Sequence, residues 1–366
     1  MNKIVYIIMF ATTLFLSGCW DERSLKDLYL STGQGVDINE GGKLQITSIF
    51  LDFSDDDDGQ NVITENSQTF RGARDRFNRE IPGDSSLANT TFILLSEKVA
   101  KKDLFPTLSV FFKSSQNSTR PLLALTKDSI EDIFTKIEKK RYDYMLHLLE
   151  EADRATIAPE INLFDLFPII FSQGIDFSIP YLELQDDIKV SGIALFHKNS
   201  FTGTILYGDE ATLYMLLIDQ IGNTARMEIK VGEINNNPSF VILDTTKSKS
   251  EVEVNIENEK IKVIVSLSVK MSLQDSSDIG VEEMDTKDLE KELAQLLTTE
   301  AERIIHKLQD ANCDAFGIGK TLNSKYHEVW KKLDWEKEYQ DVIIEPIIDV
   351  QIIDSGILKF QGNNKL

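Results

Sequence analysis

The residues best suited to metal binding lie in the acidic segment from Ser54 to Glu65. This segment places Ser54, Asp56, Asp58, Gly59 and Glu65 at positions one, three, five, six and twelve of a calcium-binding loop. The first ligand is serine, however, and a predicted strand rather than a helix precedes the loop. A solvated acidic turn is therefore the preferred interpretation, and calcium binding by Asp56, Asp58 and Glu65 is the alternative.

Two shorter motifs resemble catalytic sequences, but each lacks a required residue. Gly319-Lys320-Thr321 matches the end of a phosphate-binding loop, yet Asp314 stands where that loop requires its first glycine. His327-Glu328 begins like the helix of a zinc peptidase, yet the fourth residue after His327 is Lys331 instead of a second histidine. The sequence also contains no G-x-S-x-G elbow and no S-x-x-K pair. These observations predict a protein that is not an enzyme.

The remaining cysteine, histidine and tryptophan side chains fit packing better than catalysis. Cys313, at a predicted helix end, is interpreted as a partly buried structural thiol. Trp330 and Trp335 are interpreted as core and edge packing, and an exposed platform for a partner is the alternative. No cofactor is predicted. Three further histidines are scattered and are interpreted as surface or packing residues: His147, His197 and His306.

The charge balance excludes one class of partner. The chain has 366 residues, with 39 Lys and Arg against 60 Asp and Glu, which gives a formal net charge of −21. Such a surface repels phosphate backbones and anionic lipid headgroups. Nucleic-acid binding is therefore not expected. Only two cysteines occur, which excludes a disulfide framework or a zinc site built from thiolates.

The N-terminus carries the pattern of a lipoprotein signal peptide. Lys3 precedes an apolar run from Ile4 to Leu16, which is too short for a permanent membrane-spanning helix but matches the hydrophobic region of a signal peptide. Leu16-Ser17-Gly18-Cys19 follows, in which small residues precede a cysteine. We therefore expect removal of residues 1–18, lipidation of Cys19 and attachment of the mature chain to a membrane through the lipid. The acidic body is expected to stand off an anionic membrane, held by its lipid alone.

Strands and helices alternate in the N-terminal half. Leu28–Ile38 and Leu44–Phe53 form a predicted hairpin, because apolar and polar residues alternate on both sides of a turn. After Thr69 the alternation of strands and helices indicates an α/β region. Its predicted strands are Thr91–Ser96 and Leu122–Thr126. Its predicted helices lie around Ala73 and Phe77 and at Ala100–Phe112, Tyr142–Arg154 and Asn162–Ser172. A further helix is predicted to begin at Asp128, with the Asp128 carboxylate as its N-terminal cap.

Strands precede helices in the C-terminal part. A predicted strand pair, Lys189–Phe196 and Thr202–Leu206, is followed by a helix at Ala211–Ile218 and could add to the sheet of the first hairpin. The later elements are predicted as strands at Phe240–Asp244, Glu251–Ile256 and Ile261–Met271, helices at Lys287–Gln309 and Leu322–Leu333, and a final strand pair at Val342–Ile353 and Leu358–Phe360. This order is typical of an α+β domain with an antiparallel sheet.

The predicted fold class is therefore α+β, with several small domains that each hold a mostly antiparallel or mixed sheet and packed helices. After the signal peptide, an N-terminal α/β region is expected over 19–187, with the hairpin 28–53 and residues 60–187 as possible subdomains. Residues 188–225 hold the middle strand pair and helix, which could pair with 28–53. A C-terminal α+β domain is expected over 226–366.

Four groups of residues carry a family pattern. Gly18-Cys19-Trp20-Asp21-Glu22-Arg23 stands at the mature start, Gly33-Gln34-Gly35-Val36-Asp37 in the first strand, and Ser191-Gly192-Ile193-Ala194-Leu195-Phe196 with Gly203 in the middle hairpin. The closing group consists of Asp314, Phe316, Gly317, Gly319, Trp330, Trp335 and Gly356. In this order they resemble the Ger(x)C lipoproteins, the C subunits of spore germinant receptors.

The resemblance implies three small mixed α/β domains and a subunit without catalytic activity. It also implies a place on the outer face of the inner spore membrane. The expected partners are a polytopic A subunit and a transporter-like B subunit, with which the protein would convert nutrient binding into ion release and germination. The partners are implied by the resemblance alone.

A solute-binding lipoprotein of a membrane transporter is the alternative. Such a protein needs two similar lobes around a cleft with convergent aromatic and charged groups. The two predicted sheet regions are unlike, which favours the receptor subunit. A secreted hydrolase lacks its nucleophile and its metal ligands in this sequence.

Overall fold

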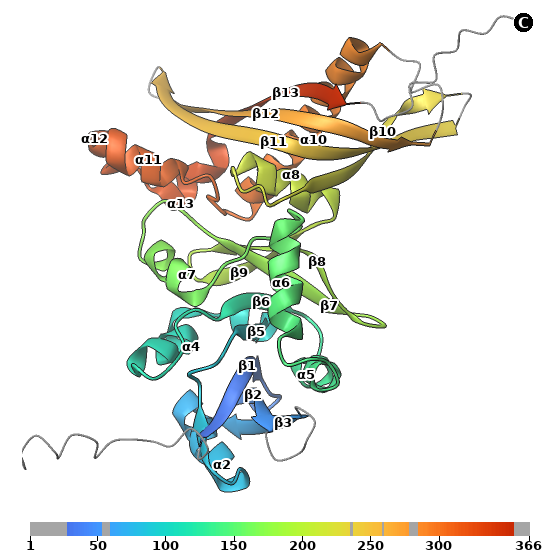
Figure 1. The fold of residues 1–366 in the computed structure, drawn as a ribbon. Helices are drawn as coiled ribbons and strands as arrows, with labels where there is room; N and C mark the ends of the chain where they lie inside the picture. The colour runs from blue at the N-terminus through green and yellow to red at the C-terminus, as the bar shows by residue number, and fades with distance from the viewer. Residues whose placement is uncertain (1–27, 53–58, 235–236, 258–259, 278–284, 355–366) are drawn as a thin grey trace, which may run out of the picture.

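The computed structural model of the chain describes residues 28–52, 59–234, 237–257, 260–277 and 285–354. These residues form two β-sheets with packed helices, one above the other in Figure 1. The two sheets, each with its own packed helices, confirm the predicted α+β class. The predicted lipidation motif, residues 53–58 with the four aspartates Asp55–Asp58, and the predicted strand Leu358–Phe360 lie outside the described residues.

The first sheet has nine strands and begins with the predicted hairpin. In spatial order they are β3 (Gly59–Ser67), β2 (Leu44–Asp52), β1 (Leu28–Ile38), β5 (Phe92–Ser96), β6 (Leu122–Thr126), β7 (Ser178–Leu184), β8 (Ile188–His197) and β9 (Ser200–Tyr207), and the short β4 (Asp84–Ser86) pairs with β1. β1, β5, β6 and β7 run parallel, while the strands on both sides of this group pair antiparallel. Every residue of β5 and β6 is buried, as expected for parallel strands covered on both faces.

Helices cover both faces of this sheet. The apolar sides of α2 (Phe70–Glu80), α3 (Glu97–Ala100), α4 (Phe105–Leu108), the 3-10 helix η2 (Ser109–Lys113) and α7 (Leu163–Ile170) pack on one face. The other face carries α5 (Ile130–Glu138) and α6 (Tyr144–Arg154). We call this sheet with these helices the N-terminal unit.

Two predicted helices of this unit differ in the structure. The helix expected over Ala100–Phe112 is wrong, because α3 ends at Ala100 and a second helix begins only at Phe105. Pro106 has no N–H to donate, which suits the first turn of a new helix better than the interior of a long one. Asp128 does not cap α5: Ser129 accepts from the Asp132 N–H at 3.2 Å, and Asp128 instead accepts from the Leu184 N–H at 2.7 Å.

The middle strand pair does not pair with the first hairpin. β8 and β9 belong to the same sheet, but β5, β6 and β7 lie between them and β1. The chain crosses over the sheet through helices and adds each parallel strand next to the previous one, so the hairpin and the middle pair end at opposite sides of the sheet.

The second sheet has four strands in sequence order: β10 (Ala225–Ile234), β11 (Asn237–Glu257), β12 (Lys260–Ser276) and β13 (Ile343–Asp354). β11 is one strand where two were predicted, because its pairing with β12 continues past irregularities in register. The sheet is mixed instead of wholly antiparallel. β13 runs parallel to β12, since the helical segment between them carries the chain back to the same end of the sheet.

A helical segment packs against this sheet and forms with it the C-terminal unit. It consists of α10 (Thr286–Asp310), α11 (Ile318–Lys325), α12 (His327–Trp330), α13 (Trp335–Glu338) and the 3-10 helix η3 (Tyr339–Asp341). The single helix predicted over Leu322–Leu333 is wrong, because the backbone leaves helical geometry at Tyr326 (φ −129°, ψ 45°).

Helix α8 (Asp209–Leu217) joins the two units into one core. All residues from Ala211 to Leu217 are buried, which is typical of a helix enclosed on every side. Ile193 and Leu195 of β8 share a buried apolar cluster with this helix and with Val263 and Leu267 of β12. The two sheets therefore pack on a common element.

Candidate functional site at the junction of the two units

A cavity of about 1010 Å³ lies where the N-terminal and C-terminal units meet. The N-terminal unit lines it with residues 169–176, at the end of α7 and directly after it, and with residues 197–199 at the turn between β8 and β9. The C-terminal unit lines it with Asn312, Asp314, Asn323, His327, Trp330, Lys331, Leu333, Asp334, Trp335, Glu336 and Tyr339. Both polar and aromatic side chains thus meet at the junction.

Asp314 is the most deeply buried acid of this wall, with 2% of its surface exposed. One carboxylate oxygen accepts from the Ile318 N–H at 2.9 Å, and the other accepts from the Gly319 N–H at 2.8 Å and from the indole N–H of Trp335 at 3.1 Å. Burial raises the pKa of Asp314 to about 7, and these donors oppose that rise because they favour the charged form. The carboxyl group therefore titrates near neutral pH.

Asp176 approaches Asp314 from the N-terminal unit. Its backbone N–H donates to the Asp314 carbonyl at 2.9 Å, and its carboxylate accepts from the Asp314 N–H at 2.9 Å. The same carboxylate accepts from the Lys198 N–H at 2.6 Å and lies 3.3 Å from Nδ1 of His197. The hydrogen bond with Asp176 raises the pKa of His197. Lys198 also forms an ion pair with Glu336, so charged contacts cross the junction.

Two glycines allow the backbones of the two units to touch. The carbonyl of Gly174 accepts from the Lys320 N–H at 2.7 Å. A Cβ atom on Gly174 would lie 2.3 Å from the carbonyl carbon of Gly319, and one on Gly319 would lie 2.5 Å from Nε1 of Trp335. Both distances are shorter than any real Cβ contact, so only glycine fits at either position.

Three aromatic rings complete the wall of the C-terminal unit. The ring centroids of Trp330 and Trp335 are 5.8 Å apart, and those of Trp335 and Tyr339 are 5.6 Å apart. Tyr339 is buried and donates its hydroxyl to the Cys313 carbonyl at 2.8 Å. The two tryptophans are half-buried and line the cavity. One part of each ring packs against the apolar core, and the other part is accessible to solvent.

The carboxylates of the junction are engaged with backbone groups. Both carboxylates use their oxygens to hold backbone N–H groups, and Cys313 is fully buried with the pKa of its thiol raised well above the usual value. The described residues contain no group of three or more acidic, histidine or cysteine side chains able to hold a metal ion.

Two family models of spore germination proteins match the chain, one over each half. A family model described as "Spore germination protein N-terminal domain" matches residues 21–184, and one described as "Spore germination B3/ GerAC like, C-terminal" matches residues 191–356. The chain is a Ger(x)C family protein. It is 23% identical to spore germination protein KC of Bacillus subtilis (strain 168), over 92% of this chain and 91% of that protein.

The fold of this Ger(x)C protein also has a solved counterpart. The crystal structure of the GerBC protein matches 88% of this chain and 97% of its own, with a TM-score of 0.58 and 17% sequence identity. At this identity the likeness concerns the fold alone. In the described residues of the Ger(x)C chain, no helix has the length and apolar character needed to cross a bilayer.

The Ger(x)C motif residues of the closing segment come together at the junction. Gly317 is the N-cap of α11 and has a positive φ of 67°, Gly319 touches the other unit, and Phe316, Trp330 and Trp335 pack against the shared core. The other motif residues lie in the first sheet: Gly33, Gly35 and Asp37 on β1, Ser191, Gly192 and Phe196 on β8, and Gly203 on β9. Cys19, Trp20, Asp21, Arg23 and Gly356 lie outside the described residues.

The predicted calcium site remains a prediction. Asp56 and Asp58 lie outside the described residues, while Glu65 lies on β3 and forms an ion pair with Arg76 at 3.7 Å. Burial, together with the neighbouring Glu80, raises the pKa of Glu65.

Sequence reasoning missed the N-terminal half of the junction. Gly174 and Asp176 were assigned no role, and His197 was interpreted as a surface or packing residue, although its half-buried ring lies at hydrogen-bonding distance from Asp176. A glycine and an aspartate shortly before a strand were the available signal. That signal could not identify partners more than 100 residues away in the sequence.

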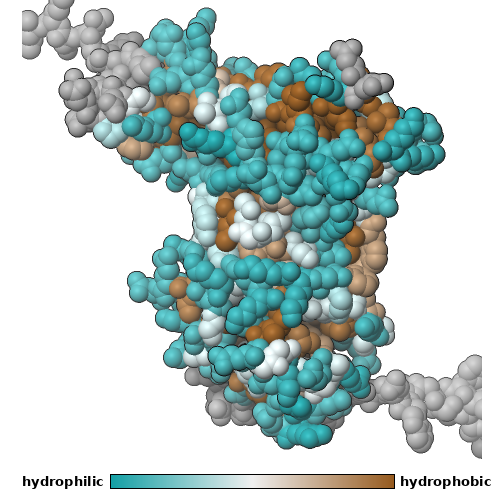
Figure 2. Space-filling model, turned by 180° about the vertical axis from the view of Figure 1, so that it is seen from behind, coloured by the Kyte–Doolittle hydropathy of each residue, from teal (hydrophilic) through white to brown (hydrophobic). Residues whose placement is uncertain are grey.

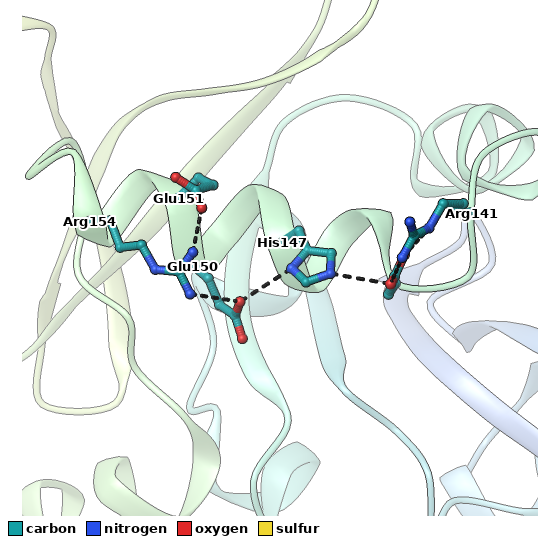
Figure 3. Close-up of polar contacts among 6 residues, drawn as sticks. Arg141, His147, Glu150, Glu151 and Arg154 are labelled. Atoms are coloured by element: carbon teal, nitrogen blue, oxygen red, sulfur yellow. Dashed lines mark hydrogen bonds and ion pairs between the residues drawn. The ribbon is translucent and has the colours of Figure 1, made fainter.

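Another charged group of this Ger(x)C protein follows the exposed side of α6. His147 lies 3.2 Å from the Asp143 carboxylate and 3.3 Å from that of Glu150, and Arg141 and Arg154 pair with the two ends of the row (Figure 3). His147, Glu150 and Arg154 are spaced three or four residues apart on one solvated face of α6, while Arg141 and the N-cap residue Asp143 precede the helix. Such pairs stabilise a helix slightly and define no cavity.

Proposed function

We propose that this protein is the lipid-anchored, non-catalytic C subunit of a spore germinant receptor, held at the outer face of the inner spore membrane by a lipid on Cys19. In this proposal it acts with the A and B membrane subunits in nutrient-triggered germination. The observation that carries the proposal is the succession of two spore-germination family models over residues 21–184 and 191–356 of one chain.

The junction supports a role in assembly or coupling. Gly174, Asp176 and Gly319 fix the two units against each other through backbone hydrogen bonds and direct backbone contact. In this proposal the two units move as one body, so that a force applied to one unit reaches the other. The carboxylates at the junction are occupied by N–H donors, which agrees with a structural role.

The lipid anchor can be tested with the two cysteines of the chain. Spores producing Cys19→Ala or Cys313→Ala protein are fractionated, and the protein is partitioned between detergent and aqueous phases. Wild type and Cys313→Ala are expected in the detergent phase, because only Cys19 follows the small residues of the lipidation motif. Cys19→Ala protein is expected in one of two forms. If its signal peptide is removed, it is expected in the aqueous phase; if its signal peptide is retained, it is expected as an unprocessed precursor of higher mass. Lipid-bearing, mature Cys19→Ala protein would contradict the proposal.

A further inference from the structure

Phenylalanines on two neighbouring helical segments form a partly exposed ridge on the N-terminal unit. Phe105 of α4 lies 5.4 Å from Phe171 and 5.9 Å from Phe167, measured between ring centroids, and Phe112 of η2 lies 3.8 Å from Phe167. Phe164, on the same helix α7, is 52% exposed, and Phe171 is 66% exposed. We call these five residues the phenylalanine ridge. Large exposed aromatic rings of this kind usually mark a contact surface.

Cations border this ridge although the whole chain is strongly acidic. The guanidinium of Arg120 lies 5.8 Å from the ring centroid of Phe164, and the exposed Lys113 directly follows Phe112. Within the described part of the chain, neither cation has a carboxylate at ion-pair distance. Two exposed carboxylates also lie beside the rings: Asp103 accepts from the Phe105 N–H at 2.9 Å, and Asp165 accepts from the Asn162 amide at 2.5 Å. The ridge thus combines apolar rings with two cations that no ion pair with a described residue neutralises.

A second apolar area lacks this combination. Figure 2 shows hydrophobic residues near the top of the molecule, over the C-terminal unit. On β13, which belongs to this unit, the exposed Ile343 and Ile347 alternate with the acidic side chains of Glu345 and Asp349, and Glu345 is paired with Lys262 at 3.0 Å. An anionic surface would repel these carboxylates, whereas it would attract Lys113 and Arg120.

We infer that the phenylalanine ridge rests on the headgroup region of an anionic membrane. Aromatic rings prefer the boundary between acyl chains and headgroups, and neighbouring lysine and arginine side chains are attracted by anionic lipids. The inference deepens the proposed function, because a lipid on Cys19 would keep the chain near the bilayer. It adds a defined orientation: α4 and α7, which lie on the same side of the molecule in Figure 1, face the membrane.

The contact can be measured with a fluorescent label at one position. Phe171→Cys is introduced into the full lipidated chain and labelled with an environment-sensitive dye, and Cys313 does not interfere because it is fully buried. Tyr142→Cys is the matched control, since Tyr142 is an exposed aromatic residue (46%) at the opposite side of the unit, before α6. The proteins are placed in vesicles of phosphatidylcholine and phosphatidylglycerol (7:3) that carry a doxyl-labelled lipid quencher.

We expect the dye at position 171 to be quenched at least about twofold more than the dye at position 142, and this difference to shrink in vesicles of phosphatidylcholine alone. Equal, weak quenching at both positions in vesicle-bound protein would overturn the ridge contact but leave the lipid anchor intact. Protein that does not co-sediment with vesicles would overturn both. Shielding of position 171 only after the membrane subunits are added would overturn the lipid contact in favour of a protein contact. A difference that is the same in both vesicle compositions would overturn the role assigned to the cations.

Discussion

Asp176 and Asp314 exchange two hydrogen bonds of 2.9 Å across the junction, although 138 residues separate them in the sequence. One bond joins two backbone groups, and the other joins the backbone of Asp314 to the carboxylate of Asp176. The Asp314 side chain then holds the start of α11 and the indole of Trp335. This pair therefore connects the N-terminal unit to the tryptophan-lined wall of the cavity.

The buried carboxyl of Asp314 should make stability depend on pH. Its folded pKa of about 7 lies above the ordinary value of 3.8, so the folded state binds this proton more tightly than the unfolded chain does. Between these values the contribution of Asp314 to stability falls as the pH rises, by up to about 1.4 kcal/mol for each pH unit. Asp314→Asn removes this titration but leaves at least one N–H donor without an acceptor, at a cost of about 1–3 kcal/mol.

The measurement is the free energy of unfolding of both proteins in denaturant at pH 5 and pH 7. Subtracting the variant from the wild type cancels the titration of all other groups, and the difference should shrink by about 2 kcal/mol between the two pH values. Exposed Asp341→Asn is the control, and its difference from wild type should stay constant. A constant difference for Asp314→Asn as well would show that this carboxyl is already ionised at pH 5.

Gly319→Ala should weaken the junction. The new methyl group would collide with the Trp335 indole and with the Cα of Gly174, at 2.5 and 2.7 Å, so one unit must shift away from the other. We expect a loss of about 1–3 kcal/mol, seen as a lower midpoint of thermal unfolding. Gly41→Ala is the matched control, because its Cβ would meet only Asn39 Oδ1 at 3.4 Å. Equal midpoints for the two variants would contradict the close contact.

Trp335→Phe should act on Asp314 and not only on packing. The substitution keeps an aromatic ring but removes the N–H that donates to the Asp314 carboxylate at 3.1 Å. The loss should cost about 1 kcal/mol at neutral pH and should raise the pKa of Asp314 further, because that donor favours the charged form. Titration of the Asp314 carboxyl by NMR checks the shift. Trp330→Phe changes the neighbouring ring without removing a donor to Asp314, and a similar shift there would contradict this explanation.

The protein alone should not bind nutrients. Isothermal titration of the purified full chain with a panel of amino acids and sugars is expected to give no saturable heat, since the polar groups of the junction are engaged with one another. A site tighter than roughly 100 μM, about −5.5 kcal/mol, would contradict this and favour the solute-binding lipoprotein. Loss of that site in Trp335→Ala would place it in the junction cavity.

Local patterns in the sequence predicted many of the elements but not their arrangement. The hairpin β1–β2, the buried strand β6 and the long helix α10 follow from apolar periodicity and turn residues, which depend on neighbours in the chain. The predicted contact between the hairpin and the middle strand pair was wrong, because strand order depends on crossovers that periodicity does not encode. β3 was missed, since its sequence Gly-Gln-Asn-Val-Ile-Thr-Glu-Asn-Ser is mostly polar.

The sequence singled out residues only in the C-terminal half of the junction. Gly317, Gly319 and Trp335 stood out by their types and by the family resemblance, and they lie together in the structure. Gly174 and Asp176 gave no comparable signal, because their function depends on contacts with residues far along the chain. The pKa of Asp314 depends on burial, which the sequence alone does not give.

Affinity purification from spore membranes tests the central claim most directly. The full chain, with a tag after Leu366, is purified in mild detergent from inner spore membranes, and the retained proteins are identified by mass spectrometry. The proposal predicts that a polytopic A subunit and a transporter-like B subunit are retained with the wild-type protein and are lost, or strongly reduced, with Cys19→Ala. Purification without these subunits, or together with an ATP-driven permease, would contradict the assignment as a germinant receptor subunit.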